Sequence, residues 1–326
     1  MHPTLLTIGK YSISSYTVFL DLGLILALVM AFLEGKRVLG NGERSEYRSK
    51  GHAGPLAAVP ERERSGRSAS GPLFSAASVP NQKGRGAQYA AAGEAALDAG
   101  LWTIVGGIVG GRIGFVVGNV EAFSEDWVRA LRIWEGGLSF HGAFLGGLAA
   151  LILVGYLQSR SAGQGVLPYL LRLADTLTLS LATGLFFGWI ACLLGGCVYG
   201  AMGEGLGYAV LPDLYGVEAS RFATQAVGAG LTLILLAAFW LLRRRWPFSG
   251  AAFLMFLLLY FTGVFFLEFT RGDEAIYVSS WRLAQIVDLA LVVLAGAGLL
   301  ALWWRARNVE EVVEEAEKLE GEISAD

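Results

Sequence analysis

The sequence carries little charge for its length. Charged residues make up 16% of 326 positions, well below the roughly 25% of soluble domains. The net charge of −3 is too small to indicate a nucleic-acid partner. Two cysteines and three histidines leave few combinations of metal ligands, and no nucleotide, metal or haem motif occurs at a credible spacing. We therefore expect no nucleic acid, no metal site and no cofactor.

Apolar residues are abundant instead, at 54% of the chain, and they gather in long runs. About 20 apolar residues in a helix cross the roughly 30 Å hydrocarbon core of a bilayer. Such runs lie near Ile13–Leu33, Leu101–Val120, Gly142–Leu157, Ala174–Leu194, Phe222–Leu242, Gly250–Phe269 and Leu283–Trp304. The sequence predicts an all-α, polytopic membrane bundle of about seven transmembrane helices, in a single membrane domain over residues 1–326.

Basic residues predict the orientation of this bundle. If successive helices alternate in direction, the Lys and Arg nearest the helix ends gather on one side: Lys36, Arg37, Arg243, Arg244, Arg245, Arg305 and Arg307. The positive-inside bias assigns that side to the cytoplasm. We expect the N-terminus outside and the C-terminus in the cytoplasm.

Two segments lack an apolar period. Residues 36–93 are rich in Gly, Ser, Ala, Arg and Glu, which predicts a flexible, low-complexity cytoplasmic insert. Its basic residues could alternatively touch anionic lipid headgroups. Residues 305–326 form a charged cytoplasmic tail, with helical charge spacing from Glu310 to Glu320.

The two cysteines, Cys192 and Cys197, are five positions apart near the end of the fourth run. On a continuous helix this spacing separates them by about 140°, which disfavours a shared metal site. We interpret them as small packing residues, with redox-active or substrate-proximal thiols as the alternative. A disulfide requires that the helix end between them.

Glycine recurs at helical spacing. Gly106, Gly110, Gly114 and Gly118 fall at every fourth position, and Gly142 and Gly146 repeat the spacing on the next run. Small residues spaced in this way let two membrane helices approach closely. We therefore expect tight helix packing along these glycines.

Ionisable side chains at or near membrane depth each require a partner or a function. The candidates are Asp21, Arg112, His141, Asp175, Glu268, Arg271 and Asp288. His141 is the one histidine of the predicted membrane part, and an imidazole accepts a proton near neutral pH. The alternative is a hydrogen-bonded packing residue.

The residues around His141 read Trp134-Glu135-Gly136-Gly137-Leu138-Ser139-Phe140-His141-Gly142-Ala143-Phe144-Leu145-Gly146-Gly147. This stretch resembles the signature of bacterial prolipoprotein diacylglyceryl transferases. Further similar stretches follow in the family's order: Ser15–Thr17, Gly110–Phe115, Ala174–Asp175, Gly196–Gly200, Arg221 with Thr224–Gln225, and Glu268–Arg271. The resemblance covers nearly the whole chain outside the insert and the tail.

The resemblance implies an activity at the outer face of the cytoplasmic (inner) membrane. A diacylglyceryl group would move from phosphatidylglycerol to the lipobox cysteine thiol of a preprolipoprotein, whose signal peptide would be a partner, and the enzyme would act as a monomer. His141 would be the base or would position the phosphate. Glu268 would orient an arginine or transfer a proton, and Tyr16 would hydrogen-bond the headgroup, unless it is an interfacial belt residue.

The same resemblance implies a set of substrate-binding residues: Arg112, Arg221, Arg271, Ser139, Gly142 and Gly200. Each arginine has a structural alternative. Arg112 could pair with Asp175 or a carbonyl group in the bundle. Arg271 could form a helix-end ion pair with Glu268, and Arg221 could be an interfacial anchor.

The chain departs from the family pattern where a phospholipid headgroup would need positive charge. Trp189 and Val264 stand where the family has arginines, and Cys192 and Cys197 replace an asparagine and a glutamate. A rival hypothesis is therefore a catalytically inactive paralogue that binds lipid or a partner helix. Convergence of Arg112, Arg221 or Arg271 on His141 would favour the enzyme.

Overall fold

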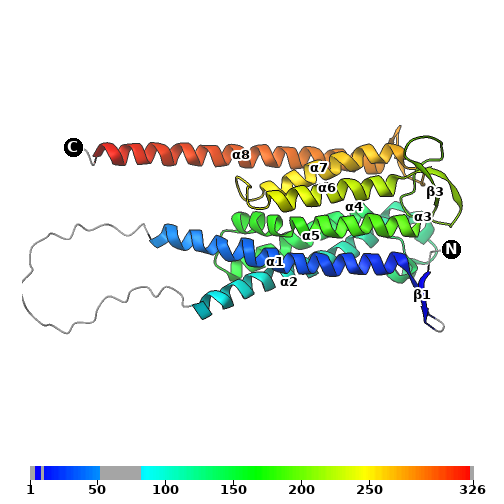
Figure 1. Ribbon diagram of the computed structural model, residues 1–326, viewed down its shortest axis with the longest axis horizontal. Coiled ribbons are helices and arrows are strands. Elements are labelled where there is room, and N and C mark those ends of the chain that lie inside the picture. The colour runs from blue at the N-terminus through cyan, green and yellow to red at the C-terminus, as the bar shows by residue number, and fades with distance from the viewer. Residues whose placement is uncertain (1–3, 9–10, 52–81, 324–326) are drawn as a thin grey trace, which may run out of the picture.

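The computed structural model describes residues 4–8, 11–51 and 82–323. Long helices run side by side along one axis (Figure 1). Within the described residues, seven helices are long and apolar enough to cross a membrane, which confirms the predicted bundle. They are α1 (Ser15–Gly51), α2 (Gln82–Gly118), α4 (Phe140–Ser161), α5 (Val166–Gly195), α6 (Thr224–Leu242), α7 (Ala251–Leu267) and α8 (Leu283–Ile323).

Short elements close one end of the bundle, which we call the hairpin end (Figure 1). They comprise α3 (Val120–Phe123), three 3₁₀ turns (Trp127–Leu131, Ile133–Glu135, Glu268–Thr270) and the strands β1 (Thr4–Ile8), β2 (Tyr11–Ser14), β3 (Tyr208–Pro212), β4 (Glu218–Phe222), β5 (Tyr277–Val278) and β6 (Trp281–Arg282). The strands pair consecutively as antiparallel hairpins, with Tyr208 opposite Phe222. The opposite end, where α8 finishes, is the tail end.

Two helices reach further into the predicted insert than hydropathy alone indicates. Helix α1 continues to Gly51 and α2 begins at Gln82, so residues 52–81 of the insert lie outside the described part of the chain. The start of α2 is rich in alanine, which favours helix without an apolar face. The charged tail likewise continues α8 as far as Ile323.

Helices α2 and α4 touch through their glycines, as their spacing predicts. A Cβ added to Gly110 would lie 2.5 Å from the Gly142 carbonyl oxygen and 2.6 Å from the Gly146 Cα. One added to Gly146 would lie 2.3 Å from the Gly106 oxygen. No larger residue fits there without separating the helices, so this contact fixes where α4 begins relative to α2.

An aromatic core joins α7 to the helices around it. Phe256, Tyr260 and Phe261 are fully buried, and the Phe261 ring lies 4.9 Å from that of Phe144 on α4. Trp189 and Val264 belong to the same cluster. The two positions where the family resemblance implies arginine are thus part of an apolar core.

Candidate functional site

His141 lies at the start of α4, where Ser139 caps the helix by accepting a hydrogen bond from the Gly142 amide. Its Nε2 is 2.8 Å from Oδ1 of Asp288 on α8. Asp288 is completely buried, and the histidine side chain is 18% exposed. Sequence reasoning assigned Asp288 no partner, because 147 positions separate the two residues and no local pattern links them.

This contact gives the two imidazole nitrogens different roles. In the tautomer that carries its hydrogen on Nε2, the imidazole donates that hydrogen to the Asp288 carboxylate. The lone pair of a neutral His141 is then on Nδ1. The other carboxylate oxygen, Oδ2, is buried without a hydrogen-bond partner in the described structure. The contact holds the imidazole ring in one orientation between α4 and α8.

Arg112 organises the backbone that leads to His141. Its guanidinium donates to four carbonyl oxygens: Arg129 at 2.6 Å, Ala130 at 2.8 Å, Gly136 at 2.5 Å and Gly137 at 3.1 Å. The side chain is only 7% exposed. Of the two structural alternatives, carbonyl pairing is confirmed.

Pairing of Arg112 with Asp175 is wrong. Asp175 instead accepts hydrogen bonds from the backbone amides of Gly250 at 2.6 Å and Phe253 at 2.9 Å. Both amides belong to the first turn of α7, whose unpaired N–H groups attract a carboxylate.

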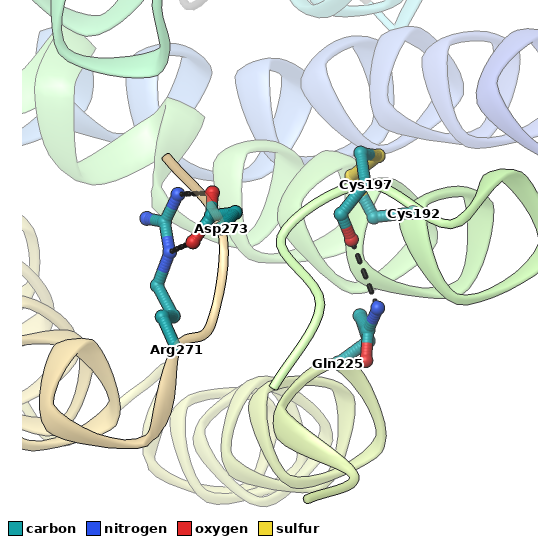
Figure 2. The surroundings of a disulfide bond; sticks show 5 residues. All are labelled: Cys192, Cys197, Gln225, Arg271 and Asp273. Atoms are coloured by element: carbon teal, nitrogen blue, oxygen red, sulfur yellow. Dashed lines mark hydrogen bonds and ion pairs between the residues drawn. A yellow bond between two sulfur atoms is a disulfide. The ribbon is translucent and has the colours of Figure 1, made fainter. Parts of the chain in front are cut away.

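Glu268 and Arg271 form the helix-end ion pair that their spacing allows. Two further residues extend it, and Figure 2 shows one of them, Asp273, beside Arg271. Arg271 also binds Asp273 through two parallel contacts, one of them Nε to Oδ1 at 2.9 Å. Arg282 of β6 reaches Glu268 at 3.4 Å and Asp273 at 3.2 Å. Glu268 and Arg282 are buried, at 2% and 6% exposed, whereas the side chains of Arg271 and Asp273 stay partly exposed.

The network shifts the ionisation of its members. Burial disfavours the Asp273 carboxylate, yet hydrogen bonds and charge from Arg271 and Arg282 outweigh burial and lower the Asp273 pKa. Burial likewise disfavours the Arg271 cation, but Asp273 and Glu268 outweigh it and raise the Arg271 pKa. Asp273 and Arg271 are therefore charged near neutral pH.

Arg221 forms a separate ion pair. It is 3% exposed, donates from Nη2 to Asp213 Oδ2 at 2.9 Å, and lies 4.6 Å from the centre of the Tyr199 ring. Backbone hydrogen bonds, first from Val217, together with the Arg221 charge, lower the Asp213 pKa. The Nε of Arg221 is buried without a hydrogen-bond partner in the described residues.

Two other predicted residues occupy close backbone contacts. The Tyr16 ring covers Gly195, where an added Cβ would lie 2.8 Å away from it. Gly200 approaches the Phe222 carbonyl oxygen so closely that an added Cβ would be 2.0 Å from it. Gly200 also pairs with Arg271, and Met202 with Arg221, in isolated β-bridges. The segment around Gly200 thus lies between the two arginines.

The interpretation of the cysteines as packing residues is wrong, because they form a disulfide (Figure 2). Helix α5 ends at Gly195, and Gly196 adopts a left-handed conformation with φ 72°. This termination turns Cys197 back toward Cys192. The side-chain amide of Gln225 donates to the Cys197 carbonyl oxygen at 2.9 Å, which ties the turn to α6.

In the described residues, no direct hydrogen bond joins His141 to Arg112, Arg221 or Arg271, so the convergence that would favour the enzyme is not seen. Within residues 4–8, 11–51 and 82–323, Arg112, Arg221 and Arg271 all have other partners. In the same residues no three His, Cys, Asp or Glu side chains are grouped so as to hold a metal ion.

Sequence comparisons agree with the resemblance noted above. A model of the family "Prolipoprotein diacylglyceryl transferase" matches residues 73–304. A Thermus thermophilus phosphatidylglycerol–prolipoprotein diacylglyceryl transferase is 32% identical over 60% of this chain and 78% of its own length. Proteins of the same name from Rhizobium meliloti and Gloeobacter violaceus are 30% and 32% identical, over 64% and 65% of this chain and 71% and 77% of theirs.

Proposed function

The chain belongs to the prolipoprotein diacylglyceryl transferase family, and we propose that it transfers the diacylglyceryl group from phosphatidylglycerol to the cysteine thiol of a preprolipoprotein. The new bond joins the thiol sulfur to the glyceryl carbon. The bond from that carbon to the phosphate oxygen breaks, and glycerol phosphate leaves. The observation that carries the proposal for this chain is the His141–Asp288 pair.

The thiol must lose its proton to become a nucleophile. With Nε2 hydrogen-bonded to Asp288, Nδ1 of His141 is the atom that accepts this proton. The imidazolium formed lies beside a completely buried carboxylate, which stabilises its charge. The pair thus supplies a base whose orientation does not depend on substrate.

Arg221 is the cation that we assign to the phosphate. Its side chain makes a single hydrogen bond among the described residues. Arg112, in contrast, donates to four carbonyl oxygens, and Arg271 is paired with two carboxylates. Arg112 and Arg271, with Ser139, Gly142 and Gly200, act as positioning groups. Glu268 and Tyr16 have the same role.

We also propose that the hairpin end faces outward from the inner membrane. The disulfide lies at this end, because Cys192 and Cys197 flank the end of α5 at Gly195, and disulfides persist in oxidising compartments outside the cytosol. The basic residues Arg243–Arg245 flank the opposite end of α6. Phosphatidylglycerol and the preprolipoprotein signal peptide would then meet a monomeric enzyme at the outer leaflet.

Complementation of a conditional diacylglyceryl transferase mutant tests this function. Wild-type chain and the Ser161→Ala control, at the far end of α4, should restore diacylglyceryl modification of a reporter lipoprotein. His141→Ala should abolish this modification. Asp288→Asn should shift the pH dependence of the transferase activity. If the well-inserted wild-type chain gives no modification, the chain is the inactive paralogue that binds lipid or a partner helix.

A further inference from the structure

A cavity of about 580 Å³ opens at the tail end, far from His141 along the bundle. Residues of α1, α5, α6 and α7 and the connection between α6 and α7 line it. Four of its side chains are arginines: Arg37 on α1, Arg172 on α5, and Arg243 and Arg244 after α6. Its size is within the range of pockets that hold small ligands.

The cavity carries an excess of positive charge. Its ionisable lining consists of these four arginines with Glu34 and Asp175, so four positive charges face two negative ones. Glu34 is paired with Arg37. Asp175 is held by the amides that begin α7. Both carboxylates are therefore committed to contacts other than the remaining three arginines.

Those three arginines have no anionic partner within the described residues. Arg172 donates to the Gln164 side-chain oxygen at 2.6 Å. Arg243 donates to the Trp240 carbonyl oxygen at 3.0 Å and lies over its ring. Arg244 is exposed at the rim of the cavity. Guanidinium groups gathered in this way match a phosphate group, which accepts several charge-assisted hydrogen bonds.

One wall of the same cavity is apolar. Phe239 and Trp246 pack with ring centres 4.9 Å apart, and Phe248 and Leu179 continue the surface. A free phosphate ion would leave this wall uncovered. The glyceryl backbone and first methylenes of a phospholipid would cover it, because the cavity lies where the membrane spans of α1, α5, α6 and α7 end or begin.

We propose that this cavity binds the headgroup of an anionic phospholipid in the leaflet at the tail end. The positive-inside bias by itself requires basic residues near helix ends, but not that residues 37, 172 and 243 share one cavity. The site is separate from the proposed active site and does not rest on the transferase activity. Its lipid would bridge the ends of α1, α5 and α6.

Native mass spectrometry of the detergent-solubilised protein tests the proposal with phosphatidic acid, which is not the proposed donor lipid. Wild type should retain it, and the double variant Arg172→Gln/Arg244→Gln should bind it about 30-fold more weakly, since each basic residue contributes roughly 1 kcal/mol. The matched control is Arg305→Gln/Arg307→Gln, which removes two arginines of α8 outside the cavity and should bind as wild type does.

Three results would overturn the proposal. The first is equal affinity of the cavity and control variants for phosphatidic acid. The second is equal binding of phosphatidylcholine, which carries no net charge. The third is binding of inorganic phosphate to wild type as tight as that of phosphatidic acid. This result would assign the arginines to a soluble ion instead of a lipid.

Discussion

The two ends of the bundle use arginine differently. At the hairpin end, Arg112 and Arg282 are buried and donate to backbone carbonyls and carboxylates. At the tail end, Arg172, Arg243 and Arg244 line a cavity that holds fewer carboxylates than arginines. Arg112 and Arg282 are satisfied within the chain, whereas the three tail-end arginines leave positive charge for a ligand.

This difference shows why a membrane-depth arginine is weak evidence for a phosphate site. Burying a cation is costly unless it is paired, so an arginine near the hydrocarbon region usually has an internal partner. Arg271 is an example, with Glu268 and Asp273 as its partners. The hydrogen-bond donors that remain unpaired, and not the arginine count, identify a binding site.

The largest expected effect follows from breaking the hairpin-end network. Glu268→Ala removes one of two carboxylates that face Arg271 and Arg282 and leaves buried positive charge uncompensated. We expect a loss of about 3–5 kcal/mol in the free energy of unfolding, measured by thermal or denaturant unfolding in detergent. Glu218→Ala, an exposed position on β4, is the control and should change little. Equal losses of unfolding free energy in the two variants would contradict a stabilising role for the buried Glu268.

Loss of the disulfide should have a smaller effect. The bond between Cys192 and Cys197 closes a loop with a sequence separation of 5, for which chain entropy predicts about 2 kcal/mol of stabilisation. Cys192→Ala/Cys197→Ala should lower the unfolding temperature accordingly. A reductant should lower that of wild type but not of the variant. A variant as stable as wild type would show that Gln225 and Gly196 hold the turn without the bond.

The sequence predicted those parts of the structure that local patterns specify. Apolar runs of helical length located seven spans to within a few residues at most ends, and glycine spacing predicted the close packing that α2 and α4 show. The disulfide was missed although a signal existed. Consecutive glycines at Gly195 and Gly196 are typical of a helix end, and a helix end there is the condition for pairing Cys192 with Cys197.

Long-range pairs could not be predicted in this way. Asp288 and His141 come from helices with no shared local pattern. Arg282 reaches Glu268 from β6, where the β5–β6 hairpin turns the chain back. Which of several buried ionisable groups pair depends on how loops cover the bundle. The periodicity of a single sequence does not indicate which of these groups pair.

Acid should weaken the hairpin end selectively. The Asp273 pKa is lowered in the folded state, so its contribution to stability is present above the unfolded-state value of about 4 and is lost as pH falls through the folded-state pKa. Unfolding temperatures of wild type should therefore decline below about pH 4. Asp273→Asn should be less stable at neutral pH and should show a shallower decline. If the unfolding temperatures of wild type and Asp273→Asn fall in parallel with pH, Asp273 does not contribute to the loss of stability in acid.

The smallest effect is expected at the tail end. Arg172→Gln/Arg244→Gln removes cations that have no anionic partner in the described residues, so the free energy of unfolding in lipid-free detergent should stay within about 0.5 kcal/mol of wild type. Added phosphatidic acid should then raise the unfolding temperature of wild type and not of the variant, because a ligand stabilises the state that binds it. A large loss of stability without lipid would instead mean that these arginines hold the helices together, as those of the hairpin end do.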